Sequence, residues 1–228
     1  MASVSHIFVD EVHERDLNTD FLLIILKDLL ARRKSLKLVL MSATLNADTF
    51  SSYFAGTPTV TIPGRTFPVK EHRLEDVLQM TGYEVVAGSN YAQKKKKNDK
   101  APQTSKTVLK TMYGSKYDSK VIDSLAIVDE SVINYELIAA LLKYIADTQG
   151  EGAILVFLPG LMEITKAIEE VKKNQFFNNT STALVYPLHS SLSTAEQTAI
   201  FEVPPPGVRK VIFSTNIAGT SSFARLLM

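Results

Sequence analysis

An apolar strand that runs directly into two adjacent acids sets the strongest limit on the fold of this chain. Residues 7–9 are Ile-Phe-Val, and Asp10 and Glu11 follow at once. This pattern predicts a buried parallel strand with both carboxylates at its C-terminal edge, where ligands bind in open α/β sheets. Two acids there suit phosphate chemistry, because the first can hold Mg²⁺ and the second can orient the water that attacks a γ-phosphate. The alternative is that they merely cap a surface turn.

Apolar strands and amphipathic helices alternate along the rest of the chain. Helices are expected to begin at Asn18 or Thr19, at Asn46, and at Ser131 or Asn134, with another at residues 161–174 and a last one opened by the capping box at residues 193–196. Strands are expected at residues 36–41, 59–62, 153–158, 183–188 and 208–214. Strands and helices that alternate twice over predict an α/β fold with two parallel-sheet lobes.

The periodicity fades from about residue 74, which predicts a boundary between the lobes. The lysine run at residues 94–97 and the polar residues up to Lys120 indicate a solvated, disordered insertion, although a lysine run can also touch phosphate backbones. We therefore expect the end of a first lobe at residues 1–73, a linker with a Lys-rich insertion at 74–130, and the start of a second lobe at 131–228.

Composition excludes several classes of protein. The chain has 228 residues and no cysteine, so disulfide frameworks and thiolate metal sites are excluded. No apolar run reaches the roughly eighteen residues of a membrane span, and no signal segment is evident, which predicts an intracellular protein without a membrane partner. The formal net charge is only +1, so any contact with nucleic acid must be local.

Two longer blocks carry a resemblance to a known family. Residues 10–15 read DEVHER and residues 40–47 read LMSATLNA, and together they resemble the DEAH-box RNA helicases. Four more blocks follow in the order of that family, at residues 62–69, 154–160, 187–192 and 214–218. Several ordered blocks are more specific than any one of them, and only residues 76–125 and the last few lie outside the resemblance. It implies two RecA-like lobes, both incomplete here.

The resemblance also implies roles in the first lobe. Asp10 corresponds to the acid that holds the Mg²⁺ of ATP, and Glu11 to the acid that orients the attacking water. His13 and the tripeptide Ser42, Ala43 and Thr44 correspond to residues that couple nucleotide state between the lobes. From the residues alone, His13 could be a surface histidine or a metal ligand with Asp10, and Ser-Ala-Thr could be a routine helix cap.

In the second lobe the resemblance implies residues that bind RNA and residues that bind the nucleotide. Thr215 and Asn216 follow a predicted strand, where a hydroxyl can meet an RNA phosphate without reading sequence, and Thr215 corresponds to the family's RNA-binding threonine. Ser221 corresponds to a nucleotide sensor and Phe201 to the aromatic ring that stacks on adenine. The residues alone also allow an ordinary polar pair at Thr215 and Asn216, and a core position for Phe201.

Departures from the family bear on activity. No G-x-x-x-x-G-K-[ST] loop occurs in the sequence, and Gly219 stands where the family has glutamate. We expect part of a cytoplasmic or nuclear ATP-dependent RNA helicase with negligible activity of its own. The alternative is a non-catalytic, truncated product that binds RNA or an unidentified protein partner. A different P-loop ATPase is disfavoured, because the blocks at residues 62–69 and 215–218 have no reason to recur there.

Overall fold

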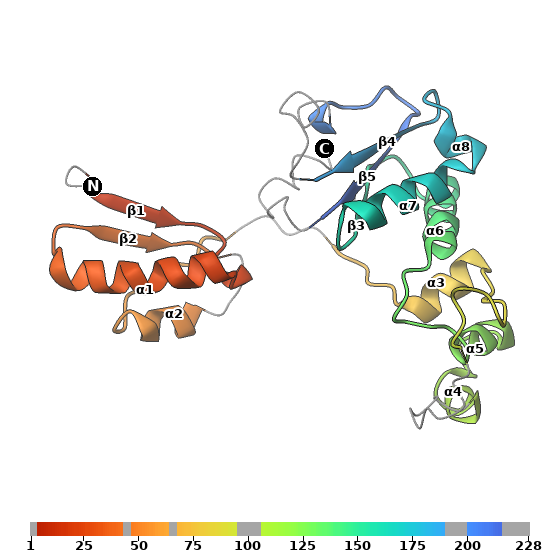
Figure 1. The fold of residues 1–228 in the computed structure, drawn as a ribbon, viewed down its shortest axis with the longest axis horizontal. Coiled ribbons are helices and arrows are strands. Elements are labelled where there is room, and N and C mark those ends of the chain that lie inside the picture. The colour runs from red at the N-terminus through yellow and green to blue at the C-terminus, as the bar shows by residue number, and fades with distance from the viewer. Residues whose placement is uncertain (1–3, 43–46, 64–67, 95–105, 190–199, 216–228) are drawn as a thin grey trace. The chain divides into compact units, whose positions relative to one another are not determined.

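The chain divides into two compact units, Met1–Pro68 and Val69–Met228. This computed structural model describes residues 4–42, 47–63, 68–94, 106–189 and 200–215. Each unit contains its own parallel sheet (Figure 1), which confirms the predicted α/β class. None of the described helices combines the length and hydrophobicity that a transmembrane helix requires.

The first unit is built on two parallel strands, β1 (His6–Val9) and β2 (Lys37–Leu40), joined by the long helix α1 (Leu17–Arg32). A short helix, α2 (Ala47–Tyr53), follows β2. Side chains alternate along β1, so that Val9 is buried in a cluster with Val12 and Leu26, whereas Phe8 is 62% exposed. The core of this unit therefore lies on one face of the sheet.

Three details of the first unit differ from the sequence predictions. The N-cap of α1 is Asp16, whose carboxylate accepts the N–H groups of Asn18 and Thr19 at 3.0 and 3.1 Å. The helix, which is expected to be amphipathic, buries Leu23 and Leu26 but leaves other apolar side chains exposed, among them those of Phe21, Leu22, Ile24 and Ile25. Residues 59–62 form no strand. They are exposed along their whole length, and no strand in the described part of the chain pairs with their backbone groups.

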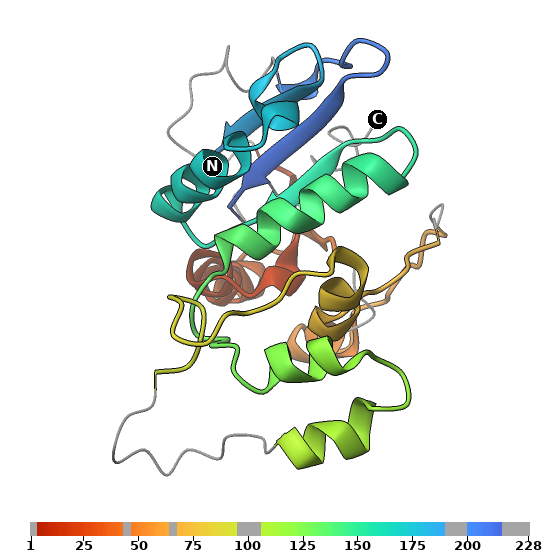
Figure 2. The same cartoon turned by 90° about the vertical axis from the view of Figure 1, so that its right-hand side faces the viewer.

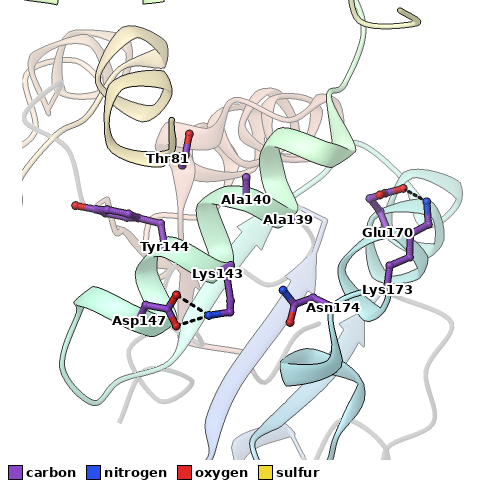
Figure 3. Close-up of a pocket in the computed structure, with 9 residues that line it drawn as sticks. All are labelled: Thr81, Ala139, Ala140, Lys143, Tyr144, Asp147, Glu170, Lys173 and Asn174. Carbon is purple, nitrogen blue, oxygen red and sulfur yellow. Dashed lines mark hydrogen bonds and ion pairs between the residues drawn. The ribbon is translucent and has the colours of Figure 1, made fainter. Parts of the chain in front are cut away.

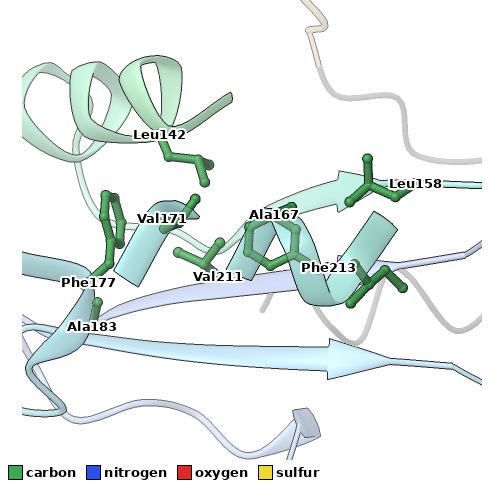
Figure 4. Close-up of a cluster of buried hydrophobic side chains, with 9 residues drawn as sticks. Leu142, Leu158, Ala167, Val171, Phe177, Ala183, Val211 and Phe213 are labelled. Carbon is green, nitrogen blue, oxygen red and sulfur yellow. The ribbon is translucent and has the colours of Figure 1, made fainter. Parts of the chain in front are cut away.

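The second unit has a three-stranded parallel sheet in the order β3-β5-β4, with bounds Ile154–Phe157, Arg209–Ser214 and Ala183–Leu188. The helices α6 (Tyr135–Thr148), α7 (Leu161–Lys172) and α8 (Gln175–Asn178) contribute to a buried cluster on one face (Figure 4). A smaller cluster of Leu188, Ile200 and Ile212 uses alternate strand positions. The central strand β5 is therefore buried on both faces. These strands, α6 and α7 confirm the sequence predictions; α8 was not predicted.

Three further helices form where the sequence predicts no regular structure: α3 (Leu74–Thr81), α4 (Lys106–Tyr113) and α5 (Ser119–Leu125). They lie together on one side of α6, away from the sheet (Figures 1 and 2). Leu78, Tyr117 and Val121 form a buried cluster with Leu137 of α6. The prediction of a solvated insertion up to Lys120 is therefore wrong for residues 106–120, which include α4 and the start of α5. A few well-spaced apolar residues suffice for packing. Residues 95–105, with most of the lysine run, lie outside the described residues.

Candidate functional site

The two acids lie at the carboxyl edge of the first sheet, beside Ser42. Pairing continues past the ends of both strands, because Met41 N–H donates to the carbonyl of Val9 at 2.8 Å and Val12 N–H donates to the carbonyl of Met41 at 3.1 Å. Asp10 and Ser42 therefore leave neighbouring strands at the same edge, as the sequence predicts. Ser42 is exposed, whereas Ala43 and Thr44 lie outside the described residues.

The carboxylate of Asp10 points away from the core and has spare coordinating capacity. Its Oδ1 accepts the backbone N–H of Glu11 at 2.9 Å, and its Oδ2 has no partner within the described part of the chain. The described residues hold no cluster of three or more histidine, aspartate or glutamate side chains that could bind a metal. A single carboxylate nevertheless fits Mg²⁺, which keeps several waters and commonly takes its remaining ligands from substrate phosphates.

The backbone around Glu11 is held in an uncommon conformation. Glu11 and Arg15 both have left-handed dihedral angles, with φ of 53° and 52°, and they flank a 3₁₀ turn, η1 (Val12–Glu14). The buried side chain of Val12 fixes this turn to the core. Arg15 donates from Nε and Nη2 to the carboxylate of Asp20 at 2.8 and 2.9 Å. Left-handed residues with a Cβ are disfavoured and cluster at functional sites.

His13 lies beside the second acid. Its Nδ1 is 3.4 Å from Oε2 of Glu11, with the two side chains only 17% and 22% exposed. The two groups are close, but their alignment does not make this contact a hydrogen bond. The structure thus brings together four sequence-predicted residues, Asp10, Glu11, His13 and Ser42, on one strand-end surface.

In the second unit, Thr215 directly follows the central strand β5. Its N–H donates to the carbonyl of Leu188 at 3.4 Å, and its carbonyl accepts the hydroxyl of Ser214 at 2.8 Å. Its Oγ1 is buried and has no hydrogen-bond partner among the residues that are described. A buried hydroxyl without a partner is costly, so this atom is a candidate for a ligand contact. Asn216 and Ser221 lie outside the described residues.

Phe201 is not a core residue. Its neighbour Ile200 is 1% exposed and packs on Leu188 and Ile212, while the side chain of Phe201 is 38% exposed. The sequence alone also allows Phe201 to be a core residue, but in the structure Ile200 is the buried side chain of this pair. The ring of Phe201 is therefore accessible to a ligand.

Two basic residues on β5 escaped the sequence predictions. Lys210 is 2% exposed, and its Nζ donates to the carbonyls of Ile200 and Glu202 at 3.0 and 2.9 Å. Burial lowers the pKa of Lys210. Arg209 donates to backbone carbonyls at the end of α6. The sequence did contain a signal for them, because two adjacent basic residues stand within the otherwise apolar run that is predicted to form this strand.

A hollow of about 600 Å³ lies on the outer surface of α6 and α7 (Figure 3). Two lysines line it, and each forms an ion pair with a carboxylate three or four residues away in the chain: Lys143 with Asp147, and Lys173 with Glu170. The cations are therefore neutralised, and none of the sequence-predicted site residues lines this hollow.

Comparisons with known proteins point to one family. The DExH-box ATP-dependent RNA helicase DExH1 of Arabidopsis thaliana is 44% identical over 231 residues, which cover 97% of this chain and 23% of that protein. The human ATP-dependent DNA/RNA helicase DHX36 is 38% identical over 234 residues, with the same coverage of 97% and 23%. No protein-family model matches the chain.

The fold agrees with these relatives. The crystal structure of the Escherichia coli DEAH/RHA helicase HrpB matches with a TM-score of 0.63 at 26% identity, over 97% of this chain and 21% of that one. Both sheets thus belong to a helicase fold of the RecA-like class, as expected. The chain spans only between a fifth and a quarter of the length of the relatives that it matches.

Proposed function

Because this chain belongs to the DExH/DEAH-box family of ATP-dependent RNA helicases, we propose that it is part of a motor that couples ATP hydrolysis to movement along RNA. One observation carries the proposal: the exposed carboxylate of Asp10 stands beside Glu11 and Ser42 at the carboxyl edge of a parallel sheet. This edge is where open α/β sheets bind their ligands.

The first unit acts on the phosphates in this proposal. The unpaired Oδ2 of Asp10 is available to hold Mg²⁺ through water, and the bound ion would neutralise charge on the β- and γ-phosphates. Glu11 orients the attacking water from its position directly after Asp10, where its backbone is left-handed. His13, 3.4 Å from Glu11, links that carboxylate to changes in nucleotide state, and we assign the same coupling role to Ser42, Ala43 and Thr44.

The second unit binds RNA and the nucleotide base. The buried, unpartnered Oγ1 of Thr215 supports a hydrogen bond to an RNA phosphate, and we place Asn216 in the same contact. Such contacts position the strand without reading its sequence. The accessible ring of Phe201 supports stacking on adenine, with Ser221 as the nucleotide sensor.

We infer that the chain alone has negligible ATPase activity. Its sequence contains no G-x-x-x-x-G-K-[ST] loop, and such a loop supplies the backbone N–H donors and the lysine that hold the β- and γ-phosphates. The competing proposal is a non-catalytic module that binds RNA or a protein partner. Mg-ATP turnover in a longer polypeptide separates the two: the motor fragment binds Mg-ATP only weakly by itself but regains turnover there, whereas the module gains none.

The decisive assay measures RNA-stimulated ATP hydrolysis by a longer polypeptide that carries both this segment and a phosphate-binding loop. Glu11→Gln should lower kcat by about 10²- to 10⁴-fold, the usual contribution of a positioned acid or base. Glu14→Gln is the matched control, because Glu14 is an exposed acid in the same turn, and it should retain activity. Equal losses in both variants would refute the role given to Glu11.

The RNA contact has its own test. Thr215→Val keeps the shape of the side chain but removes the hydroxyl, whereas Thr215→Ser keeps the hydroxyl. We expect the valine variant to bind single-stranded RNA about tenfold or more weakly, the range of a hydrogen bond to a charged group. The loss should be the same for different RNA sequences, and the serine variant should bind normally. A loss confined to one RNA sequence would contradict a phosphate contact.

A further inference from the structure

A buried lysine is attached to the helix end that carries Phe201. Residues 200 and 201 are helical and residue 202 is not, and we call this helix end the turn of Phe201. Lys210 lies on β5, the central strand of the second sheet, and its ammonium group donates to the carbonyls of Ile200 and Glu202 at 3.0 and 2.9 Å. These are the residues on either side of Phe201. The ammonium therefore holds the turn at two points that flank the ring.

The buried ammonium group of Lys210 needs both of these acceptors. Lys210 is only 2% exposed, and an ammonium group taken out of water must be compensated by hydrogen bonds. On the same face of β5, Ile212 packs against the buried side chain of Ile200. Because Ile200 is fixed inward and both flanking carbonyls are fixed to one cation, the side chain of Phe201 is left on the outside.

From this geometry we propose that Lys210 is the positioning residue that holds Phe201 in place for an adenine base. The inference rests on the proposed function, since it assumes that Phe201 stacks on the base. Lys210 itself touches no nucleotide. It acts through the backbone of residues 200–202, and it couples their position to the central strand of the unit, which is buried on both faces.

The neighbouring residue on β5 provides a matched control. Arg209 also donates to two backbone carbonyls, those of Gln149 and Gly152 at 3.0 and 2.8 Å. These carbonyls lie beyond the end of α6, far along the chain from Phe201. Loss of either cation removes two side-chain hydrogen bonds from the same unit, but only the loss of Lys210 releases the turn of Phe201.

The test uses the absence of tryptophan from the chain. Phe201→Trp introduces a single indole at the proposed contact, and its fluorescence anisotropy reports how firmly the turn is held. Stacking of a base quenches the indole, so titration with AMP at millimolar concentration, against UMP, reports the adenine contact. Both readings are repeated after adding Lys210→Met or Arg209→Met, and circular dichroism confirms that each variant is folded.

We expect AMP to quench more than UMP, and Lys210→Met to lower both the anisotropy and the AMP quenching constant. The quenching constant should fall about fivefold or more, the lower end of what base stacking on an aromatic ring contributes. Arg209→Met should leave both readings unchanged. If Lys210→Met does not fold, the shorter Lys210→Gln, which keeps an N–H donor, should show a smaller change in the same direction.

The experiment distinguishes failure of the positioning role of Lys210 from failure of the adenine contact of Phe201. If AMP quenches selectively but neither Lys210 variant changes the anisotropy or the quenching, the positioning role is overturned and the proposed function stands. If AMP quenches no more than UMP in the Phe201→Trp chain, the adenine contact fails and the positioning proposal fails with it. Equal effects of Arg209→Met and Lys210→Met would also overturn the proposal, because they would show general loosening of the unit.

Discussion

Glycine at position 11 should stabilise the first unit relative to alanine, although glycine normally destabilises. Glu11 has φ of 53° and ψ of 34°, and a residue with a Cβ loses about 1–2 kcal/mol in this left-handed region. Glycine escapes that cost but loses about 0.5–1 kcal/mol through its greater freedom in the unfolded chain. With the middle of each range, the net preference for Glu11→Gly over Glu11→Ala is about 0.75 kcal/mol. Both variants lack the carboxylate, so its contact with His13 cancels in the comparison.

Amide hydrogen exchange measures this difference next to the site. Val12 N–H donates to Met41 and Met41 N–H donates to Val9, so both amides exchange when the strand ends open. A difference of about 0.75 kcal/mol makes their protection factors roughly two- to fivefold higher in Glu11→Gly than in Glu11→Ala. The control pair is Glu14→Gly and Glu14→Ala, because Glu14 lies in the same turn but has no positive φ.

At position 14 the order should reverse, with alanine about 0.5–1 kcal/mol more stable than glycine. If glycine is the less stable residue at both positions, the left-handed conformation of Glu11 imposes no cost and the reasoning is refuted. If the order reverses as expected, the proposed catalytic acid is held in a conformation that opposes stability, as is common at functional sites.

Three further predictions concern stability. Phe213→Ala empties the fully buried centre of β5 and should cost about 3–5 kcal/mol, measured as a lower urea midpoint of the second unit; an unchanged midpoint would contradict the packing. Asp16→Ala removes the cap of α1 and should lower the stability of the helix by about 1 kcal/mol. The control Asp28→Ala breaks an exposed i,i+4 ion pair and should lower it by no more than about 0.5 kcal/mol. Hydrogen exchange of the amides in the first turn of α1 measures both losses. Hydrogen bonds from the Arg73 backbone and the Tyr117 hydroxyl lower the pKa of Asp76 from 3.8 to about 2. The ionised carboxylate of Asp76 therefore stabilises the fold fully above pH 3.8, and this stabilisation is lost as the pH falls towards 2. An acid unfolding curve that Asp76→Asn leaves unchanged would exclude this contribution.

Local sequence was sufficient wherever a short apolar run and its flanking residues determine the structure. Both strands of the first unit and all three of the second follow apolar runs, and their parallel pairing follows from the intervening helices. The adjacency of Asp10 and Ser42 was also predictable, because successive parallel strands end at one edge. The roles of these residues in hydrolysis stay predictions.

Pattern alone failed where the outcome depends on distant partners. Residues 59–62 have strand-forming residues, yet Val60 and Ile62 are more than 80% exposed because no described strand pairs with them. Residues 106–125 look polar, yet Tyr117 and Val121 are buried against α3 and α6. Intrinsic preference for a strand or helix is weak compared with the energy of packing against a neighbour.

Sequence by itself determined the described strands and the helices α1, α6 and α7, the family, and which acids stand at a strand end. Tertiary structure alone decided the left-handed backbone of Glu11, the accessible ring of Phe201, and the attachment of Lys210 to the turn that carries it. None of these three features follows from the pattern of apolar and polar residues. A carbonyl of residue 200 becomes the partner of a buried cation at residue 210 only after the sheet and the turn have packed together, so no local pattern encodes that pairing.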